Sequence, residues 1–187
     1  MYTVFTAIGQ LKAHKNNSTN NIYYVVIKNG QEYGLSKQEL ILWTLLAGTF
    51  PTYDEAQKEF YLSLCDYHLT PELDFDHYLK RLSFRGLIAS STSYTQTTAL
   101  CDLIKNMTLK PSKTNMLPLS EQNSFLQSLK GLLHRPTLTA EEYKLLKKIR
   151  NTPTDAKYLL SVPQLQKRML AAITSLYEKK LLFFDCI

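Results

Sequence analysis

The chain has 187 residues, 44% of them hydrophobic and 20% charged, which is typical of a globular protein and excludes a wholly disordered one. The formal net charge is +6, and the excess lies in residues 91–187, because residues 1–90 carry eight Lys and Arg against nine Asp and Glu. No apolar run has the roughly 18–20 residues of a membrane span, and no signal peptide is evident at the N-terminus.

The N-terminal region predicts two strands. Residues Tyr2–Ile8 and Ile22–Ile27 are rich in β-branched and aromatic side chains, as strands require. The polar residues 16–21 lie between them as a loop, and Asn29-Gly30 predicts a turn after the second strand. We therefore expect an N-terminal β-hairpin.

A first set of three helices follows. Ser36 and Glu39 have the spacing of a capping box, and Leu35 with Leu40 forms a hydrophobic staple at the same helix start. We expect this helix to end at Gly48, and a second helix to cover residues 53–65. A third helix then runs into a short apolar strand at residues 87–88.

The second half repeats this pattern. Thr139 and Glu142 form a second capping box, with Leu138 and Tyr143 as the staple, and Asn151 ends the helix. A short helix is expected over residues 155–160. A closing helix after Pro163 runs into a strand at residues 181–184. Between the halves we expect connecting helices at residues 97–107 and 120–133, separated by a stretch with two prolines.

These matching patterns predict an α+β fold, mostly α, with two tandem winged-helix-like units. The start motifs are 103 residues apart, whereas the closing motifs are 94 residues apart, so the first unit is longer in its middle. Chance similarity between amphipathic helices is the alternative explanation. The expected domains are a winged-helix-like unit with N-terminal strands at 1–95, connecting helices at 96–135, and a basic winged-helix-like unit at 136–187.

One string carries a resemblance to known DNA-binding proteins. Residues 78–88, Tyr-Leu-Lys-Arg-Leu-Ser-Phe-Arg-Gly-Leu-Ile, resemble the end of the recognition helix and the start of the wing in MarR-type winged-helix regulators. The resemblance implies dimers that place the third helix in the major groove of DNA. The first unit departs from that family, because Asp74 and Asp76 open its third helix and residues 89–93 contain no arginine. In the second unit, the chain ends three residues after Phe184, too soon for a wing hairpin.

The first unit also resembles PqqD-like peptide-recognition domains. The resemblance rests on Trp43-Thr44-Leu45-Leu46-Ala47-Gly48 and on the string from Leu79 to Ile88, which follow N-terminal strands as in that family. Domains of this kind add an extended peptide to the edge of a strand. The resemblance therefore implies a peptide or protein partner.

The excess of positive charge points to duplex DNA as the partner of the second unit. Lysines and arginines contact phosphates, and glutamines can read adenine edges. A solvated helix face is the alternative explanation of the same charges. The candidate DNA-binding residues are Lys144, Lys147, Lys148, Arg150, Lys157, Gln164, Gln166, Lys167 and Arg168.

Tyrosines mark a candidate partner surface in the first unit. The chain has 12 tyrosines, and tyrosine is enriched at protein interfaces, although many of these rings could equally be half-buried core. A protein partner or a homodimer is expected there. The candidates are Tyr23, Tyr24, Tyr53 and Tyr61, with Tyr67 and Tyr78 as further members of the set.

Cysteine and histidine patterns give no support to catalysis or metal binding. The cysteines at 65, 101 and 186 are odd in number and widely spaced, which predicts free thiols and a cytoplasmic location. Cys65, His68 and His77 are too few and too scattered for a zinc site. We expect no enzyme activity, no cofactor and no membrane partner. The sequence favours a DNA-binding transcriptional regulator, and the alternative is a non-enzymatic protein- or peptide-binding adaptor on the same fold.

Overall fold

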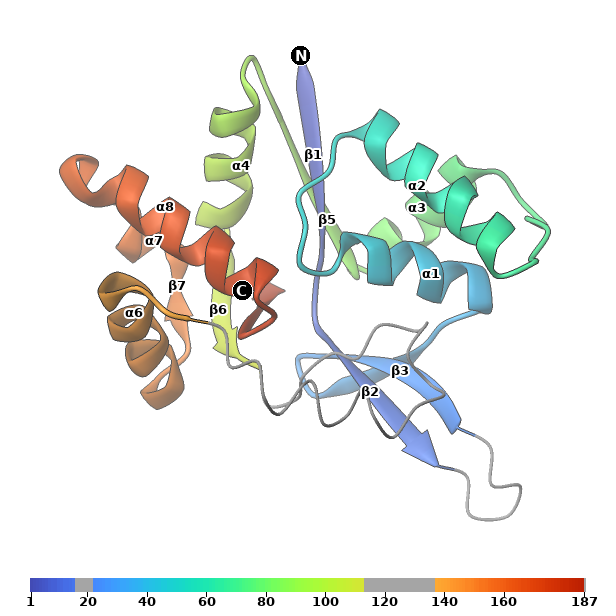
Figure 1. Ribbon diagram of the computed structural model, residues 1–187, viewed down its shortest axis with the longest axis horizontal. Coiled ribbons are helices and arrows are strands. Elements are labelled where there is room, and N and C mark those ends of the chain that lie inside the picture. Colours follow the sequence, from blue (N-terminus) through green and yellow to red (C-terminus); the bar gives the residue numbers. More distant parts are fainter. Residues whose placement is uncertain (16–21, 113–136, 187) are drawn as a thin grey trace.

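The computed structural model describes residues 1–15, 22–112 and 137–186. Over these residues the fold is mixed α and β, with seven helices and small antiparallel sheets (Figure 1). The strands are β1 Tyr2–Ala7, β2 Gln10–Lys15, β3 Ile22–Lys28, β4 Gln31–Gly34, β5 Ile88–Ser93, β6 Met107–Pro111, β7 Thr154–Asp155 and β8 Leu182–Cys186. The helices are α1 Lys37–Leu46, α2 Tyr53–Asp66, α3 Phe75–Phe84, α4 Gln96–Lys105, α6 Ala140–Asn151, α7 Ala156–Leu159 and α8 Pro163–Glu178.

Two segments of the chain share one order of elements. In the N-terminal segment, residues 2–93, the order is β1, α1, a bridge between Thr52 and Val4, α2, α3 and β5. In the C-terminal segment, residues 107–186, the order is β6, α6, β7, α7, α8 and β8. The first strand of each segment lies in the middle, since β1 lies between Thr52 and β5, and β6 lies between β7 and β8.

The additional sheet β2-β3-β4 belongs to the N-terminal segment alone. It is inserted between β1 and α1, and all its strands are antiparallel. Asn29 and Gly30 both have positive φ, of 48° and 79°, where the chain turns from β3 into β4. Figure 1 shows this sheet on one side of the molecule, beneath α1.

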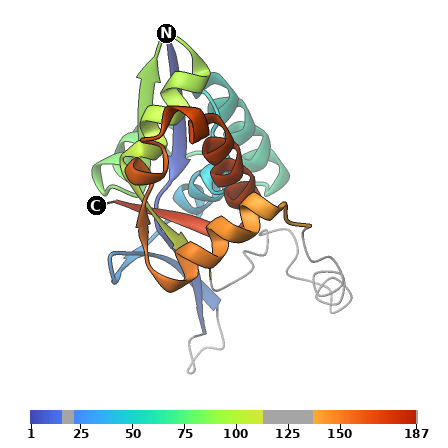
Figure 2. The same cartoon turned by 90° about the vertical axis from the view of Figure 1, so that its left-hand side faces the viewer.

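Strand β1 separates two hydrophobic cores. Phe5 and Ala7 pack into the core formed by α1, α2 and α3, whereas Val4 and Ile8 pack into the core formed by α4 and the C-terminal helices. Alternate residues of a strand point to opposite faces, so one strand can serve both cores. Figures 1 and 2 show β1 passing between the two groups of helices. The two segments therefore share an element and pack as one body.

Most of the predicted elements are confirmed, with two corrections. The capping boxes at Ser36 and Thr139 are present, and Pro163 opens α8. The predicted hairpin is wrong in its pairing, because β1 pairs with β5 and the second predicted strand, β3, pairs with β2 and β4. The first connecting helix is α4, but residues 107–111, part of the region expected to connect the halves, form the central strand β6. The expected helix at 120–133 lies outside the described residues.

Within residues 1–15, 22–112 and 137–186, no helix combines the length and apolar character needed to cross a membrane.

Candidate partner groove and basic surface

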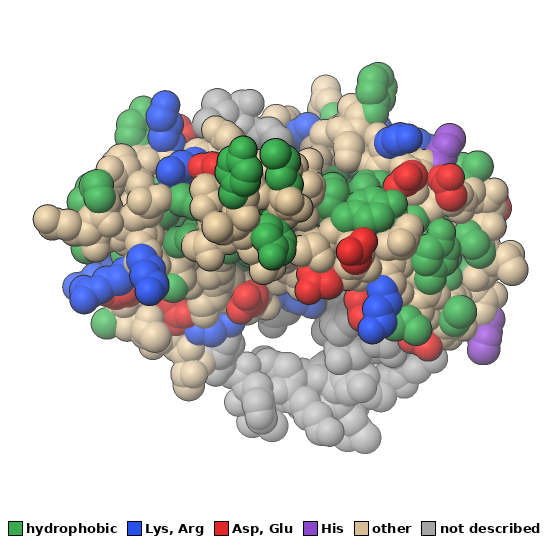
Figure 3. Space-filling view, turned by 90° about the horizontal axis from the view of Figure 1, so that it is seen from above, with side chains coloured by type: hydrophobic (Ala, Val, Ile, Leu, Met, Phe, Trp, Pro, Cys, Tyr) green, Lys and Arg blue, Asp and Glu red, His purple; other side chains and the backbone are tan. Residues whose placement is uncertain are grey.

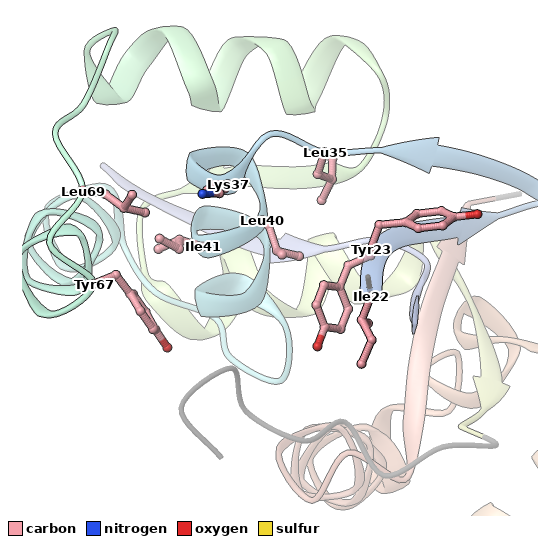
Figure 4. A pocket seen from close by; sticks show the side chains of 9 residues that line it. Ile22, Tyr23, Leu35, Lys37, Leu40, Ile41, Tyr67 and Leu69 are labelled. Carbon is pink, nitrogen blue, oxygen red and sulfur yellow. The ribbon is translucent and has the colours of Figure 1, made fainter. Parts of the chain in front are cut away.

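An apolar groove of about 510 Å³ lies between the start of β3 and helix α1, and we name it the β3–α1 groove. Figure 4 shows Leu40 and Ile41 of α1 between Ile22 on one side and Tyr67 and Leu69 on the other. The lining is almost wholly hydrocarbon and aromatic, with one charged group. The lining residues are Ile22, Tyr23, Tyr24, Leu35, Lys37, Leu40, Ile41, Tyr67 and Leu69.

The groove follows the edge of a strand. Consecutive strand residues point to opposite faces of a sheet, yet Ile22, Tyr23 and Tyr24 all line this one groove. Strand β4 pairs with β3 only from Val25 to Lys28, so the first three residues of β3 extend beyond the last β3–β4 pair. The groove thus begins beside the end of β4, and Leu35, which follows β4, also lines it.

A buried carboxylate fixes the position of α1 beside the groove. The Ser36 backbone N–H donates to Glu39 Oε2 at 2.8 Å, and the Glu39 N–H donates to Ser36 Oγ at 3.2 Å. Glu39 is only 2% exposed and also forms ion pairs with Arg81 at 3.2 Å and Arg85 at 3.5 Å. These contacts join the first turn of α1 to the last turn of α3. Leu40 and Ile41 follow directly on α1 and are held at the groove by the same turn.

Two of the four predicted partner tyrosines line this groove. The Tyr23 ring is 51% exposed and stacks on His14, with ring centroids 5.3 Å apart and an interplanar angle of 11°. His14 Nε2 in turn lies 3.0 Å from Glu32 Oε1. Tyr24 is half-buried. Tyr23 is therefore braced by neighbouring strands while much of its surface stays open to a partner.

The other two tyrosines lie elsewhere, where they join α2 to α3. The Tyr53 hydroxyl donates to Asp76 Oδ1 at 2.6 Å, and this hydrogen bond, with burial and the charge of Asp76, raises the pKa of Tyr53 to about 12. The Tyr61 hydroxyl accepts from the Phe75 N–H at 3.4 Å. The set also included Tyr78, which is 2% exposed and belongs to the core. The predicted tyrosines therefore do not form one surface.

The basic residues of α6 and α7 are all exposed. Leu145, Leu146 and Ile149 bury one face of α6, and the basic residues of that helix lie outside this face, as an amphipathic pattern requires. A shallow groove of about 120 Å³ brings Lys147 together with Arg150. The exposed cations of these two helices are Lys144, Lys147, Lys148, Arg150 and Lys157.

Two of the four predicted residues of α8 line a different groove. Gln166 and Lys167 line a groove of about 350 Å³ between α4 and α8, together with Lys105 and Asp102. Gln166 Nε2 lies 2.9 Å from Cys101 Sγ and donates to it.

Two further predicted residues of α8 point to solvent. Gln164 and Arg168 are exposed, but Arg168 Nη1 lies 4.0 Å from Glu141 Oε1. Four of the nine candidates thus line two separate grooves, two in each, and the other five line neither.

Both signs of charge occur across the face drawn in Figure 3. Lys and Arg side chains project at the left, over the C-terminal helices, and others lie at the centre and right, among acidic side chains. The cations over the C-terminal helices agree with the excess of cations in the second half of the sequence.

Sequence reasoning missed most of the groove. Leu35 and Leu40 were identified only as a helix staple, and Ile41 and Leu69 were not assigned any role. The staple was a usable signal, because it places two apolar side chains at the same end of α1. That this end lies beside the start of β3 depends on tertiary packing.

No protein-family model matches the chain, and no curated protein or solved structure shows significant similarity to it.

Proposed function

We propose that this protein is a non-enzymatic adaptor that binds an extended segment of a partner protein in the β3–α1 groove. One observation carries the proposal: three consecutive residues at the start of β3, beyond the last pair with β4, line a single apolar groove. A peptide that adds to a strand uses main-chain hydrogen bonds for affinity and side-chain pockets for specificity. The β3–α1 groove supplies the side-chain pockets, and the segment would lie alongside the start of β3.

The proposed fold of the adaptor is two tandem winged-helix-like units. The shared order of elements in the two segments, with the first strand in the middle of each sheet, supports this arrangement. The PqqD-like strings around Trp43 and Leu79 support a peptide-binding role for the first unit. Trp43 itself is fully buried and donates to the Ile8 carbonyl at 3.3 Å, so its role is structural.

The groove defines the chemistry of the partner segment. Leucine, isoleucine and tyrosine side chains line it, so the segment carries large apolar side chains on the side that enters the groove. Lys37 is the one charged lining residue, and an acidic residue of the segment lies opposite it. The segment is extended, because the groove is lined by three consecutive residues of a strand.

A library of random 12-residue peptides displayed on phage tests this proposal. The immobilised full chain is expected to enrich peptides that combine large apolar residues with Asp or Glu. Ile22→Asp is expected to abolish this enrichment, because Ile22 is 59% exposed at the groove and a carboxylate there opposes both apolar contact and the acidic residue of the peptide. Synthetic versions of the enriched peptides then give dissociation constants for both proteins.

Leu62→Asp is the matched control. Leu62 is 49% exposed on α2 and does not line the groove, so the same change there is expected to leave peptide binding intact. The proposal fails if no peptide family is enriched by the wild-type chain. It also fails if Ile22→Asp binds the enriched peptides as tightly as the wild-type chain does.

Duplex DNA remains a second candidate because of the first turns of α8. Gln164, Lys167 and Arg168 are exposed there, and the first turn contains no acidic residue. A titration with nonspecific duplex at two salt concentrations separates the candidates. Steeply salt-dependent binding that is lost in Lys167→Ala/Arg168→Ala would favour DNA, whereas no binding at moderate salt would favour the adaptor.

A further inference from the structure

Strand β5 is the open edge of a two-stranded sheet. Its only strand partner is β1, and among the described residues no backbone hydrogen bond reaches its outer side. Figure 2 shows β5 at the margin of the molecule, with β1 on its inner side. Helix α4 follows it and packs against the sheet. The outer edge of β5 thus has no strand partner among the described residues.

The register shows which backbone groups face outward. The Phe5 N–H donates to the Pro51 carbonyl at 3.0 Å, on the side of β1 away from β5. Because backbone groups alternate along a strand, Val4 and Thr6 direct theirs toward β5. The residues opposite them in the register are Ser91 and Ala89. The N–H and C=O groups of the alternate residues Ile88, Ser90 and Thr92 therefore point outward.

This edge lacks the features that usually prevent strand pairing. Natural edge strands carry lysine, proline, bulges or inward charges that discourage the addition of another strand. Residues 86–101 contain no charged residue and no proline, and β5 pairs with β1 without a bulge. Ser90 and Thr92 are exposed and small. The edge is thus uncharged, and it is open to solvent at Ser90 and Thr92, whereas Ile88 at its start is 5% exposed.

We propose that β5 pairs antiparallel with β5 of a second copy of this chain, about a two-fold axis at Ser90. In this register Ser90 faces Ser90 of the partner subunit, and Ile88 faces Thr92 of the partner subunit. All three outward-facing residues then exchange both of their hydrogen bonds, as hydrogen-bonded pairs of antiparallel strands do. The result is a continuous four-stranded sheet, and the proposal is independent of the β3–α1 groove.

The charge of the chain favours a second copy at this edge. Two molecules with a net charge of +6 repel one another, so self-association is least opposed where no charge lies. The uncharged run from 86 to 101 is such a surface. A contact about a two-fold axis uses the same patch on both subunits. An antiparallel strand edge can serve as such a patch, because it can pair with a copy of itself.

Charge reversal at the two-fold axis tests the proposal in sedimentation velocity of the full chain. The wild type is expected to dimerise with a dissociation constant in the micromolar range. Ser90→Lys places two lysines opposite each other, so we expect its dissociation constant to rise about fivefold or more at low salt. Ser90→Glu is expected to weaken the dimer in the same way. An equimolar mixture of Ser90→Lys and Ser90→Glu is expected to form a heterodimer at least as tight as the wild-type dimer.

Two variants of the same residue serve as controls. Ser90→Ala keeps the backbone N–H and is expected to dimerise like the wild type. Ser90→Pro removes one outward N–H without adding charge and is expected to weaken the dimer, while the ladder to β1 is kept. Circular dichroism and the fluorescence of Trp43 report whether each variant is folded.

Three results would overturn the proposal. One is a wild-type chain that stays monomeric at about 100 µM. Another is a dimer that Ser90→Lys and Ser90→Pro both leave unchanged. The third is a mixture of the Lys and Glu variants that shows no preference for the heterodimer, as would follow if the edge received some other extended peptide.

Discussion

Two buried glutamates have matching roles at the starts of α1 and α6. Glu39 and Glu142 each complete a capping box, and each also binds a cation from the end of the third helix of its own segment. Arg85 Nη1 lies 3.5 Å from Glu39, and Lys179 Nζ lies 2.7 Å from Glu142. A buried carboxylate without a partner would be strongly destabilising, so these pairs tie first helix to third.

The Glu142 pair predicts acid sensitivity. Burial acts to raise the pKa of Glu142, but hydrogen bonds from Lys179, Ser175 and the Thr139 backbone, with the charge of Lys179, lower it to about 2. Because the folded pKa is depressed, the stabilising contribution is complete above about pH 4.5 and is lost as the pH falls toward 2. Glu142→Gln is expected to lower the free energy of unfolding at pH 7 by about 2 kcal/mol and to flatten this acid limb.

Urea unfolding at several pH values measures this effect. Glu141→Gln is the matched control, because Glu141 is the neighbouring residue but its side chain is 47% exposed. This control should leave the stability nearly unchanged. Equal pH profiles for the wild type and Glu142→Gln would contradict the prediction.

Of each ion pair, the sequence allows the glutamate to be predicted but not its cation. The spacing of Ser36 to Glu39 and of Thr139 to Glu142 indicates a capping box directly. The cation that completes each pair comes from a helix end about 40 residues later, and only the packing of first helix on third brings it near. The β3–α1 groove has the same limit, since Tyr23 was predicted but Leu69 was not.

At the scale of elements, the ends of α3 and α8 adopt the same turn with different residues. Gly86 has φ of 66° and Lys180 has φ of 58°. The next N–H reaches back to the helix in both cases, from Leu87 to the Leu82 carbonyl and from Leu181 to the Leu176 carbonyl, each at 2.9 Å. This is the Schellman arrangement, which favours glycine at the left-handed position. The C-terminal segment uses lysine there.

Lys180→Gly is expected to stabilise the protein by about 1 kcal/mol, because glycine adopts the left-handed conformation without the steric cost that a side chain carries. Thermal or urea unfolding measures the change. The reciprocal variant Gly86→Ala is expected to lose a similar amount at the end of α3. A lower melting temperature for Lys180→Gly would show that the packing of the lysine stem outweighs the backbone effect.

Elements whose own residues carry a pattern could be predicted, and those that depend on distant partners could not. The helices have apolar spacing and capping residues, so their bounds follow from local sequence. Strands β2 and β4 are mostly polar, β4 has only four residues, and β6 follows α4 with a single residue between them. Each is a strand because of its neighbours in a sheet, and a propensity scale contains no such information.

On the scale of the whole molecule, Tyr177 of α8 connects the two cores. Its hydroxyl accepts from Thr6 Oγ1 at 2.9 Å and lies 3.2 Å from the Ala7 carbonyl and 3.4 Å from the Leu46 carbonyl. Its ring packs against Phe184, with centroids 4.4 Å apart. Burial raises the pKa of Tyr177, opposed in part by hydrogen bonds with Thr6 and with the Gly48 and Ala7 backbone. The neutral phenol is therefore a buried polar link between segments far apart in the sequence.

Tyr177→Phe is expected to cost about 1–2 kcal/mol, since it removes the buried hydrogen bonds of the phenol with Thr6 and Ala7. Trp43 is the only tryptophan and lies in the N-terminal core, so its fluorescence reports unfolding on the far side of β1. We expect the midpoint in urea to fall equally by Trp43 fluorescence and by circular dichroism. Tyr158→Phe, at a 73% exposed site, is the control with no expected change. A shift seen by circular dichroism alone would show that the segments unfold separately.

The central place of β1 has a consequence for synthesis. It is the earliest of the described elements to leave the ribosome, yet its partner strand β5 ends only at Ser93. The core formed by α4 and the C-terminal helices is complete only when Phe184 has been made. At about 5–20 residues per second, the apolar side chains of β1 wait roughly ten seconds or more for their permanent neighbours. During that interval the apolar side chains of β1 are exposed on the nascent chain. A chaperone near the exit tunnel would bind β1 first.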